Sequence, residues 1–115
     1  MRRLHFRNRK ETLYIQVLCA DSGTNDLERY YRLCRQQGSI DTGCHYFIDD
    51  FGNLSVDREL SAVAGWGNTD SDTSIYIFVQ SKTGKPNDSQ DFTLNKLLRE
   101  LQKIYPDALI INRKG

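Results

Sequence analysis

The first clear pattern along the chain is an alternation that predicts a β-strand at residues 12–19, TLYIQVLC. Successive side chains of a strand point to opposite faces, so every second residue shares a face. One face is apolar and is expected to lie against the core; it carries Leu13, Ile15, Val17 and Cys19. The other face carries Tyr14, Gln16 and Leu18. The loop sequence DSGTN follows this strand.

The next segment, residues 26–37, has the spacing of an amphipathic helix. Asn25 is its expected N-cap and Gly38 its expected end. Its apolar stripe consists of Leu27, Tyr30, Tyr31 and Cys34.

A second helix is predicted from Leu94 to Tyr105, ended by Pro106. Thr93 is the expected cap, and Phe92 is expected to pack onto Leu97 as a hydrophobic staple. Its buried stripe consists of Leu94, Leu97, Leu98, Leu101 and Ile104.

Four further strands complete the pattern. Residues 44–50 and 53–57 read as two strands joined by a tight turn, and 108–111 as a short final strand. The uncharged run TSIYIFVQ at 73–80 predicts a central strand buried on both faces. Residues 58–72 form a long connection. The resulting β-α-β-β-β-α-β order predicts an α/β fold of the mixed α+β kind, with a central mixed sheet flanked by helices.

Composition limits what such a domain does. The length of 115 residues fits one domain, 1–115, and the net charge of +1 excludes a protein that binds polyanions by bulk charge. No apolar run approaches the ~18 residues of a membrane span, so no membrane partner is expected. The three cysteines form no CxxC pair, and the start of the chain does not read as a secretory signal. These features predict a cytoplasmic protein with free thiols.

The first 11 residues form a basic N-terminal arm with five Lys and Arg residues against one acid. A solvated arm is the expectation. An arm that binds phosphate or a partner is the alternative.

Four motifs in sequence carry a resemblance to a known family: the run MRRLHFRNRKETLYIQVLC, then DTGCHYFIDDFGNL, AVAGWGN…TSI, and DFT…KIYPDALI. In this order and spacing the chain resembles the type-2 N-acetylmuramoyl-L-alanine amidases, most of all their small members from short-tailed phages. Those amidases are zinc hydrolases that cut the bond between muramic acid and the first alanine of peptidoglycan. The resemblance covers nearly the whole chain. It implies their mixed sheet flanked by helices, which peptidoglycan recognition proteins share.

The residues that carry the family's chemistry differ here. Where the family has its first zinc histidine this chain has Leu18, and Cys19 next to it is expected on the opposite face. The family's catalytic tyrosine matches Cys44, and a polar histidine matches Trp66. The second zinc histidine matches Arg113, a permanent cation. The third ligand and a catalytic lysine would fall beyond the last residue of the sequence. The resemblance therefore predicts that no metal and no cofactor is bound.

Two residues offer other chemistry. His45 is expected to be a satisfied core residue that faces away from Cys44. Without a histidine on its own face, Cys44 is expected to form part of the cleft wall rather than to act as a nucleophile.

A groove remains if the fold is kept. Its expected lining, the candidate ligand-binding set, is Tyr14, Gln16, Leu18, Cys44, Tyr46, Trp66, Asn68 and Arg113, with Asp21 near the rim. Aromatic faces stack on sugars or bases, and a guanidinium grips carboxylate or phosphate. For Trp66 and Arg113 the alternatives are a loop anchor and a solvated terminal residue.

The sequence thus predicts a catalytically inactive, amidase-like protein that binds or sequesters a small ligand. The ligand is expected to be a muropeptide or a nucleotide-type signal, the latter in a phage counter-defence role inside a bacterial host. One alternative is a protein-binding regulator, such as an inhibitor of RNA polymerase. Another is a residual peptidoglycan amidase. The sequence is also compatible with a homo-oligomer.

Overall fold

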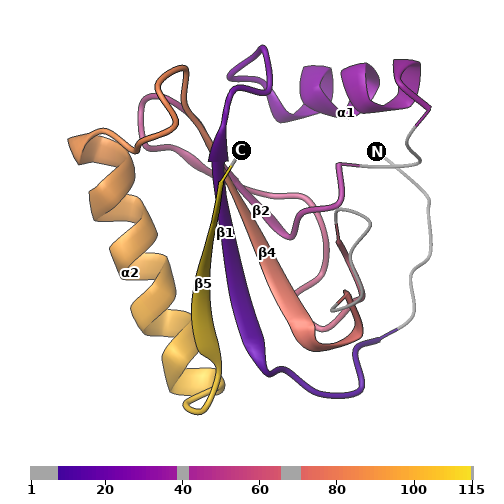
Figure 1. Cartoon of the computed structure of the whole chain (residues 1–115), viewed down its shortest axis with the longest axis vertical. Coiled ribbons are helices and arrows are strands. Elements are labelled where there is room, and N and C mark those ends of the chain that lie inside the picture. The colour runs from indigo at the N-terminus through magenta and orange to yellow at the C-terminus, as the bar shows by residue number, and fades with distance from the viewer. Residues whose placement is uncertain (1–7, 39–41, 66–70, 115) are drawn as a thin grey trace.

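A computed structural model describes residues 8–38, 42–65 and 71–114 of the chain. It shows a five-stranded sheet with a helix on each face (Figure 1). The strands are β1 (Tyr14–Ala20), β2 (Tyr46–Ile48), β3 (Leu54–Val56), β4 (Ser74–Gln80) and β5 (Leu109–Lys114). The helices are α1 (Leu27–Gln36) and α2 (Asp88–Ile104), and a 3₁₀ turn covers Ser71–Thr73.

The strand order is β3-β2-β4-β1-β5. β1 runs parallel to both β4 and β5, and β2 runs parallel to β4. β3 pairs with β2 in the antiparallel sense. The predicted mixed sheet and element order are confirmed.

β4 lies at the centre of the sheet, and all seven of its residues are buried. Its alternate side chains serve two cores. Ile75, Ile77 and Val79 pack with β1 and α2. Tyr76 and Phe78 pack with Phe47 of β2 and with α1. The prediction of a central strand buried on both faces is therefore confirmed.

The core on the α2 side contains Ile15 and Val17 of β1 together with Leu94, Leu97 and Leu101 of α2. These are the faces that the sequence periodicities predict. On the α1 side, the rings of Phe47 and Phe78 stack with their centroids 5.6 Å apart.

The start of α1 differs from the prediction by one residue. Its N-cap is Asp26, whose Oδ1 accepts from the backbone N–H of Glu28 at 3.0 Å. Asn25 instead accepts a hydrogen bond from the backbone N–H of Asp50, at 3.0 Å. The side chain that the local pattern predicts as the cap is therefore used in a contact with the distant loop at Asp50. None of the helix's residues is fully buried.

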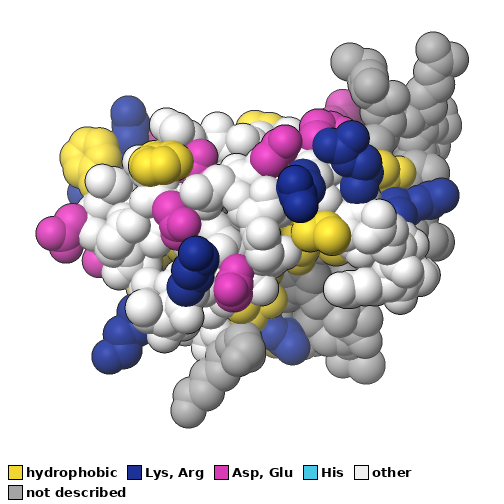
Figure 2. All heavy atoms as spheres, turned by 90° about the horizontal axis from the view of Figure 1, so that it is seen from above, with side chains coloured by type: hydrophobic (Ala, Val, Ile, Leu, Met, Phe, Trp, Pro, Cys, Tyr) yellow, Lys and Arg dark blue, Asp and Glu magenta, His cyan; other side chains and the backbone are white. Residues whose placement is uncertain are grey.

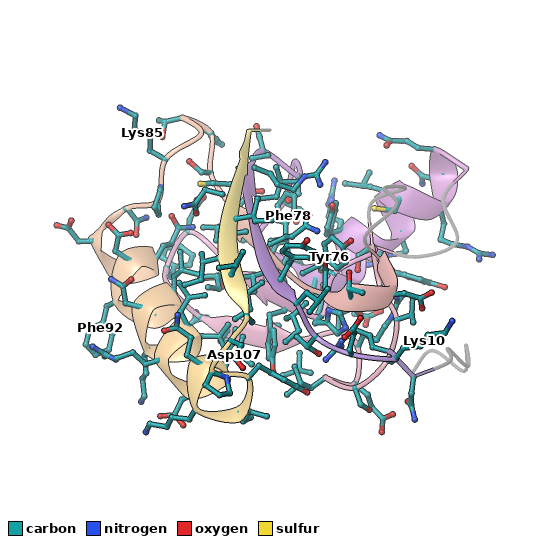
Figure 3. All side chains as sticks on the ribbon, turned by 60° about the horizontal axis from the view of Figure 1, so that its bottom comes forward. Lys10, Tyr76, Phe78, Lys85, Phe92 and Asp107 are labelled. Carbon is teal, nitrogen blue, oxygen red and sulfur yellow. The ribbon has the colours of Figure 1, made fainter. Side chains whose placement is uncertain are left out.

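Helix α2 begins earlier than predicted, at Asp88, because Asn87 and Gln90 form a capping box. Thr93 lies inside the helix, and its Oγ1 donates to the carbonyl of Gly52 at 2.6 Å. Phe92 is 71% exposed and points away from the body of the molecule (Figure 3), so the expected staple is wrong. Ile104 is also largely exposed and does not belong to the buried stripe.

The turn between β2 and β3 is held against the start of α2. Gly52 has a φ of +82°, a region that favours glycine. A Cβ at this position would lie 2.7 Å from the carbonyl oxygen of Ser89. Gln90 is buried and its Nε2 donates to the carbonyl of Asp49 at 2.9 Å. The turn, α2 and the sheet therefore meet without space for a larger residue.

The basic arm is not simply solvated. Arg9 is half-buried, and its Nη1 donates to the carbonyl of Ala62 at 3.0 Å. Its guanidinium lies 5.7 Å from the centre of the Tyr105 ring. Because Arg9 satisfies carbonyls of the long connection, the prediction of a solvated arm is wrong for this residue. Lys10 is exposed, and residues 1–7 lie outside the described part of the chain.

Within the described ranges, neither helix combines the length and the apolar character that crossing a bilayer requires.

Candidate functional site

Four of the expected groove residues come together on the α1 face of β1 and β5. Leu18 pairs in register with Arg113 across these parallel strands. Arg113 Nη1 donates to Gln16 Oε1 at 2.8 Å. Tyr14 lies two residues before Gln16, on the same face of β1, and is half-buried.

Gln16 is held from both sides. Its side chain is 1% exposed, and its Nε2 donates to Ser74 Oγ of β4 at 2.8 Å. With the Oε1 atom accepting from Arg113, the amide is oriented by strands on either side of β1. Because both ends of this buried amide are hydrogen-bonded, it holds the exposed guanidinium of Arg113 in a fixed position.

Cys44 does not form part of a cleft wall, contrary to expectation. It is fully buried beside Tyr76 and Phe78, with its Sγ 3.3 Å from Thr42 Oγ1. The residue precedes β2, so strand alternation does not decide its direction. A thiol enclosed in an aromatic core has no access to a substrate.

Tyr46 does not line the expected groove either. It packs against the core on the α2 side, whereas Phe47 next to it faces α1. Burial raises the pKa of the Tyr46 hydroxyl, with a smaller contribution from Tyr105. Tyr46 therefore lies on the face of the sheet opposite Gln16. Trp66 and Asn68 fall outside the described residues.

His45 is a satisfied core residue, as predicted. Its Nδ1 accepts from the backbone N–H of Tyr76 at 3.0 Å, so its Nε2 carries the hydrogen and donates to the carbonyl of Ala62 at 2.7 Å. Burial lowers its pKa to about 4, and the nearby Arg9 acts in the same direction. The ring is therefore neutral and fully engaged.

The zinc site implied by the resemblance can be compared with these positions. Leu18 presents hydrocarbon and Arg113 a permanent cation, and neither donates electrons to a metal. In the described part of the chain, no three His, Cys, Asp or Glu side chains gather as a metal site. The residues placed here do not fit a catalytic zinc.

Arg113 also lines a pocket that the sequence analysis did not foresee. The pocket has a volume of about 460 Å³ and lies at the carboxyl ends of β1, β4 and β5. Asp21, expected near the groove rim, lines this pocket together with Lys82 and Thr83. The available signal was the run of small and polar residues directly after the buried strand β4.

The architecture identifies a known fold. It matches the N-acetylmuramoyl-L-alanine amidase LysC from Clostridium intestinale with a TM-score of 0.77 and 17% identity, over 92% of this chain and 70% of LysC. It also matches human PGRP-IβC, solved in complex with glycosamyl muramyl pentapeptide, with a TM-score of 0.71 and 16% identity over 96% of this chain and 77% of that one. The fold is that of the amidases and peptidoglycan recognition proteins.

The sequence adds a more specific relationship. The chain is 28% identical to the endolysin of Enterobacteria phage K11 over 124 aligned positions, which span 96% of this chain and 80% of the endolysin. No family model matches the chain. The protein is thus an amidase-like relative of the phage endolysins.

Proposed function

We propose that this protein is a catalytically inactive, zinc-free relative of the phage amidases that binds a small anionic ligand in the groove over β1 and β5. The observation that carries the proposal is the pairing of Leu18 with Arg113, whose guanidinium is bonded to the buried Gln16.

The chemistry of these side chains favours binding over hydrolysis. A catalytic zinc needs three protein ligands and an open position for water. Leucine supplies no ligand, and a guanidinium repels the metal that it would have to hold. The same guanidinium forms paired hydrogen bonds with a carboxylate or phosphate. Replacing metal ligands by these residues exchanges a metal site for an anion contact.

Two ligand classes fit this contact. A muropeptide carries carboxylates, and the similar fold of PGRP-IβC was solved with a glycosamyl muramyl pentapeptide. A nucleotide-type signal carries phosphates, and its capture would serve a phage against host defence. The half-buried Tyr14 offers an aromatic face for either a sugar or a base.

A protein partner is the second candidate, and a different surface favours it. Phe51 and Phe92 are 74% and 71% exposed. They lie beside the contact between Gly52 and Thr93, so the two phenylalanines mark one region of the surface. Exposed aromatic side chains are enriched at protein interfaces. A regulator of the host or phage RNA polymerase would use such a surface.

Binding measurements test the groove. Calorimetry with a muramyl pentapeptide and with a cyclic dinucleotide should show that at least one binds to the wild-type protein. Arg113→Gln should weaken that binding by roughly tenfold or more, because it removes a charge-assisted pair of hydrogen bonds. Lys103→Gln is the matched control, since Lys103 is exposed and ion-paired with Glu100 on α2.

Metal analysis and an activity assay test the loss of catalysis. The purified protein is expected to hold no stoichiometric zinc and to release no peptide from peptidoglycan when zinc is added. One zinc per chain together with amide cleavage would overturn the proposal in favour of a residual amidase. Equal affinities for the Arg113 and Lys103 variants would move the binding site out of the groove.

A further inference from the structure

The chain path opens a crevice at one end of the sheet. From β1 the chain crosses one face through α1 to β2, and from β4 it crosses the other face through α2 to β5. The two neighbouring strands therefore send their loops in opposite directions at their carboxyl ends (Figure 1). In sheets of parallel strands, ligands bind in the crevice that this divergence leaves. The 460 Å³ pocket lies there, between the end of β1 and residues 81–84.

The pocket has a cation on either side of β1. Lys82 comes from the loop after β4, and Arg113 from β5. Figure 2 looks onto this end of the molecule, where basic and acidic side chains are interspersed. The attraction for an anion is therefore local to the pocket and does not come from a broad basic surface.

Asp21 is the acidic residue of this lining, and it is already engaged. Its Oδ1 accepts from Gln80 Nε2 at 2.9 Å and from the backbone N–H of Gly23 at 2.8 Å. These bonds, with Lys82 nearby, lower the pKa of its carboxyl group. Asp21 thus competes with any incoming anion for Lys82.

A second compartment continues from this pocket toward α2. Its volume is about 210 Å³, and it shares Cys19, Gly84 and Arg113 with the outer pocket. Its walls are mostly apolar and come from Val17, Val79, Pro86 and Leu94. It lies on the α2 face of the sheet, whereas Gln16 and its bond to Arg113 lie on the α1 face.

We propose that these joined pockets form a second ligand site, which binds a small molecule with one carboxylate and a short apolar group. The carboxylate lies between Lys82 and Arg113, and the apolar group enters the compartment beneath α2. Hydrocarbon side chains favour an apolar occupant there, while the two cations select the charge at the mouth. The site shares Arg113 with the proposed groove, and it goes beyond the proposed function through Lys82 and the compartment beneath α2.

Amide NMR titration with three related probes tests this assignment. N-acetylleucine carries both groups, N-acetylglycine lacks the apolar side chain, and N-acetylleucinamide lacks the charge. N-acetylleucine should give saturable shifts at the amides of Ala20, Lys82, Thr83 and Gly84, and it should bind more tightly than either other probe. Equal binding of the amide and the acid would overturn the anion site, and shifts elsewhere or none at all would overturn the pocket.

Three substitutions make the test specific for charge. Lys82→Gln should weaken N-acetylleucine binding roughly three- to fivefold, as expected for an exposed ion pair. Asp21→Asn should strengthen it, because the amide oxygen still accepts from Gln80 and Gly23 while the competing charge is gone. Lys85→Gln is the control: Lys85 belongs to the same loop but projects outward (Figure 3).

The variants also separate this site from the groove. If Lys82→Gln and Lys85→Gln bind N-acetylleucine equally, the second site is refuted whatever the groove binds. Lys82→Gln should leave the binding of a muramyl pentapeptide or a cyclic dinucleotide in the groove unchanged. Failure of the groove experiment therefore leaves this inference standing on its own result.

Discussion

His45 illustrates, at the scale of a single residue, how a buried polar group depends on the state of one proton. Both of its ring nitrogens are bonded to backbone groups, and the bond to Tyr76 requires Nδ1 to be without a hydrogen. Protonation would break that bond and leave a buried charge close to Arg9. The folded structure is therefore compatible only with the neutral form of the His45 imidazole.

This makes stability dependent on pH. The pKa of His45 is about 4 in the folded protein, below its ordinary value of 6.5. Above about pH 6.5 the contribution is fully present, and it is lost as pH falls toward 4, because the unfolded chain binds the proton first. The decrease in unfolding free energy is expected to reach about 3 kcal/mol. Urea unfolding across this pH range measures it.

The two histidines of the chain supply the control. His45→Gln should flatten the decline between about pH 6.5 and 4, although it lowers stability at neutral pH. His5→Gln should leave the decline as it is in the wild type. A decline that is identical in the wild type and in His45→Gln would show that other groups cause it.

At the scale of an element, the buried stripe of α2 was predicted correctly, but the residue at which the helix begins was not. Its stripe of Leu94, Leu97 and Leu101 follows from the sequence because helix geometry repeats locally. Its start does not: Thr93 was the expected cap, whereas the helix is capped by Asn87. The contact of Thr93 with Gly52, 41 residues away, uses the hydroxyl that a cap would need.

Two substitutions on α2 test this description. Leu97→Ala should lower the unfolding free energy by about 2–4 kcal/mol, since Leu97 is 8% exposed and lies in the core. Phe92→Ser should change it by less than about 0.5 kcal/mol, because Phe92 is exposed. Midpoints of urea unfolding compare the two. A large loss of unfolding free energy for Phe92→Ser would instead support the hydrophobic staple between Phe92 and Leu97.

At the scale of the whole molecule, the two cores depend on one strand. Ile75 and Ile77 of β4 face α2, while Tyr76 and Phe78 face α1. Removing β4 would open both cores at once. The sheet therefore couples α1 and α2, although each packs on its own face.

This coupling predicts that the chain unfolds as a single domain. Far-UV circular dichroism, which reports the helices, and near-UV signals of the tyrosines should give the same midpoint in urea. Two separated transitions would instead mean that the α1 and α2 sides unfold independently.

The sequence by itself determined the kind and order of the elements. Through the resemblance it also predicted that Leu18 and Arg113 stand where the family holds zinc ligands. These features are local: periodicity assigns faces, and side-chain chemistry needs no fold. The expected positions of Cys44 and Tyr46 were wrong. Cys44 lies before the regular strand, where alternation does not apply, and it is buried in the core on the α1 side. For Tyr46, alternation does not say which face of the sheet the groove occupies.

Only the tertiary structure brought distant residues together. The bond between Gln16 and Arg113 joins positions 97 residues apart, and Arg9 reaches Ala62 across 53 residues. Strand order decides such contacts, because it sets which strands are neighbours and at which end their loops diverge. The pocket beside Lys82 has the same origin, since it exists where β1 and β4 lie together and their connections leave on opposite faces.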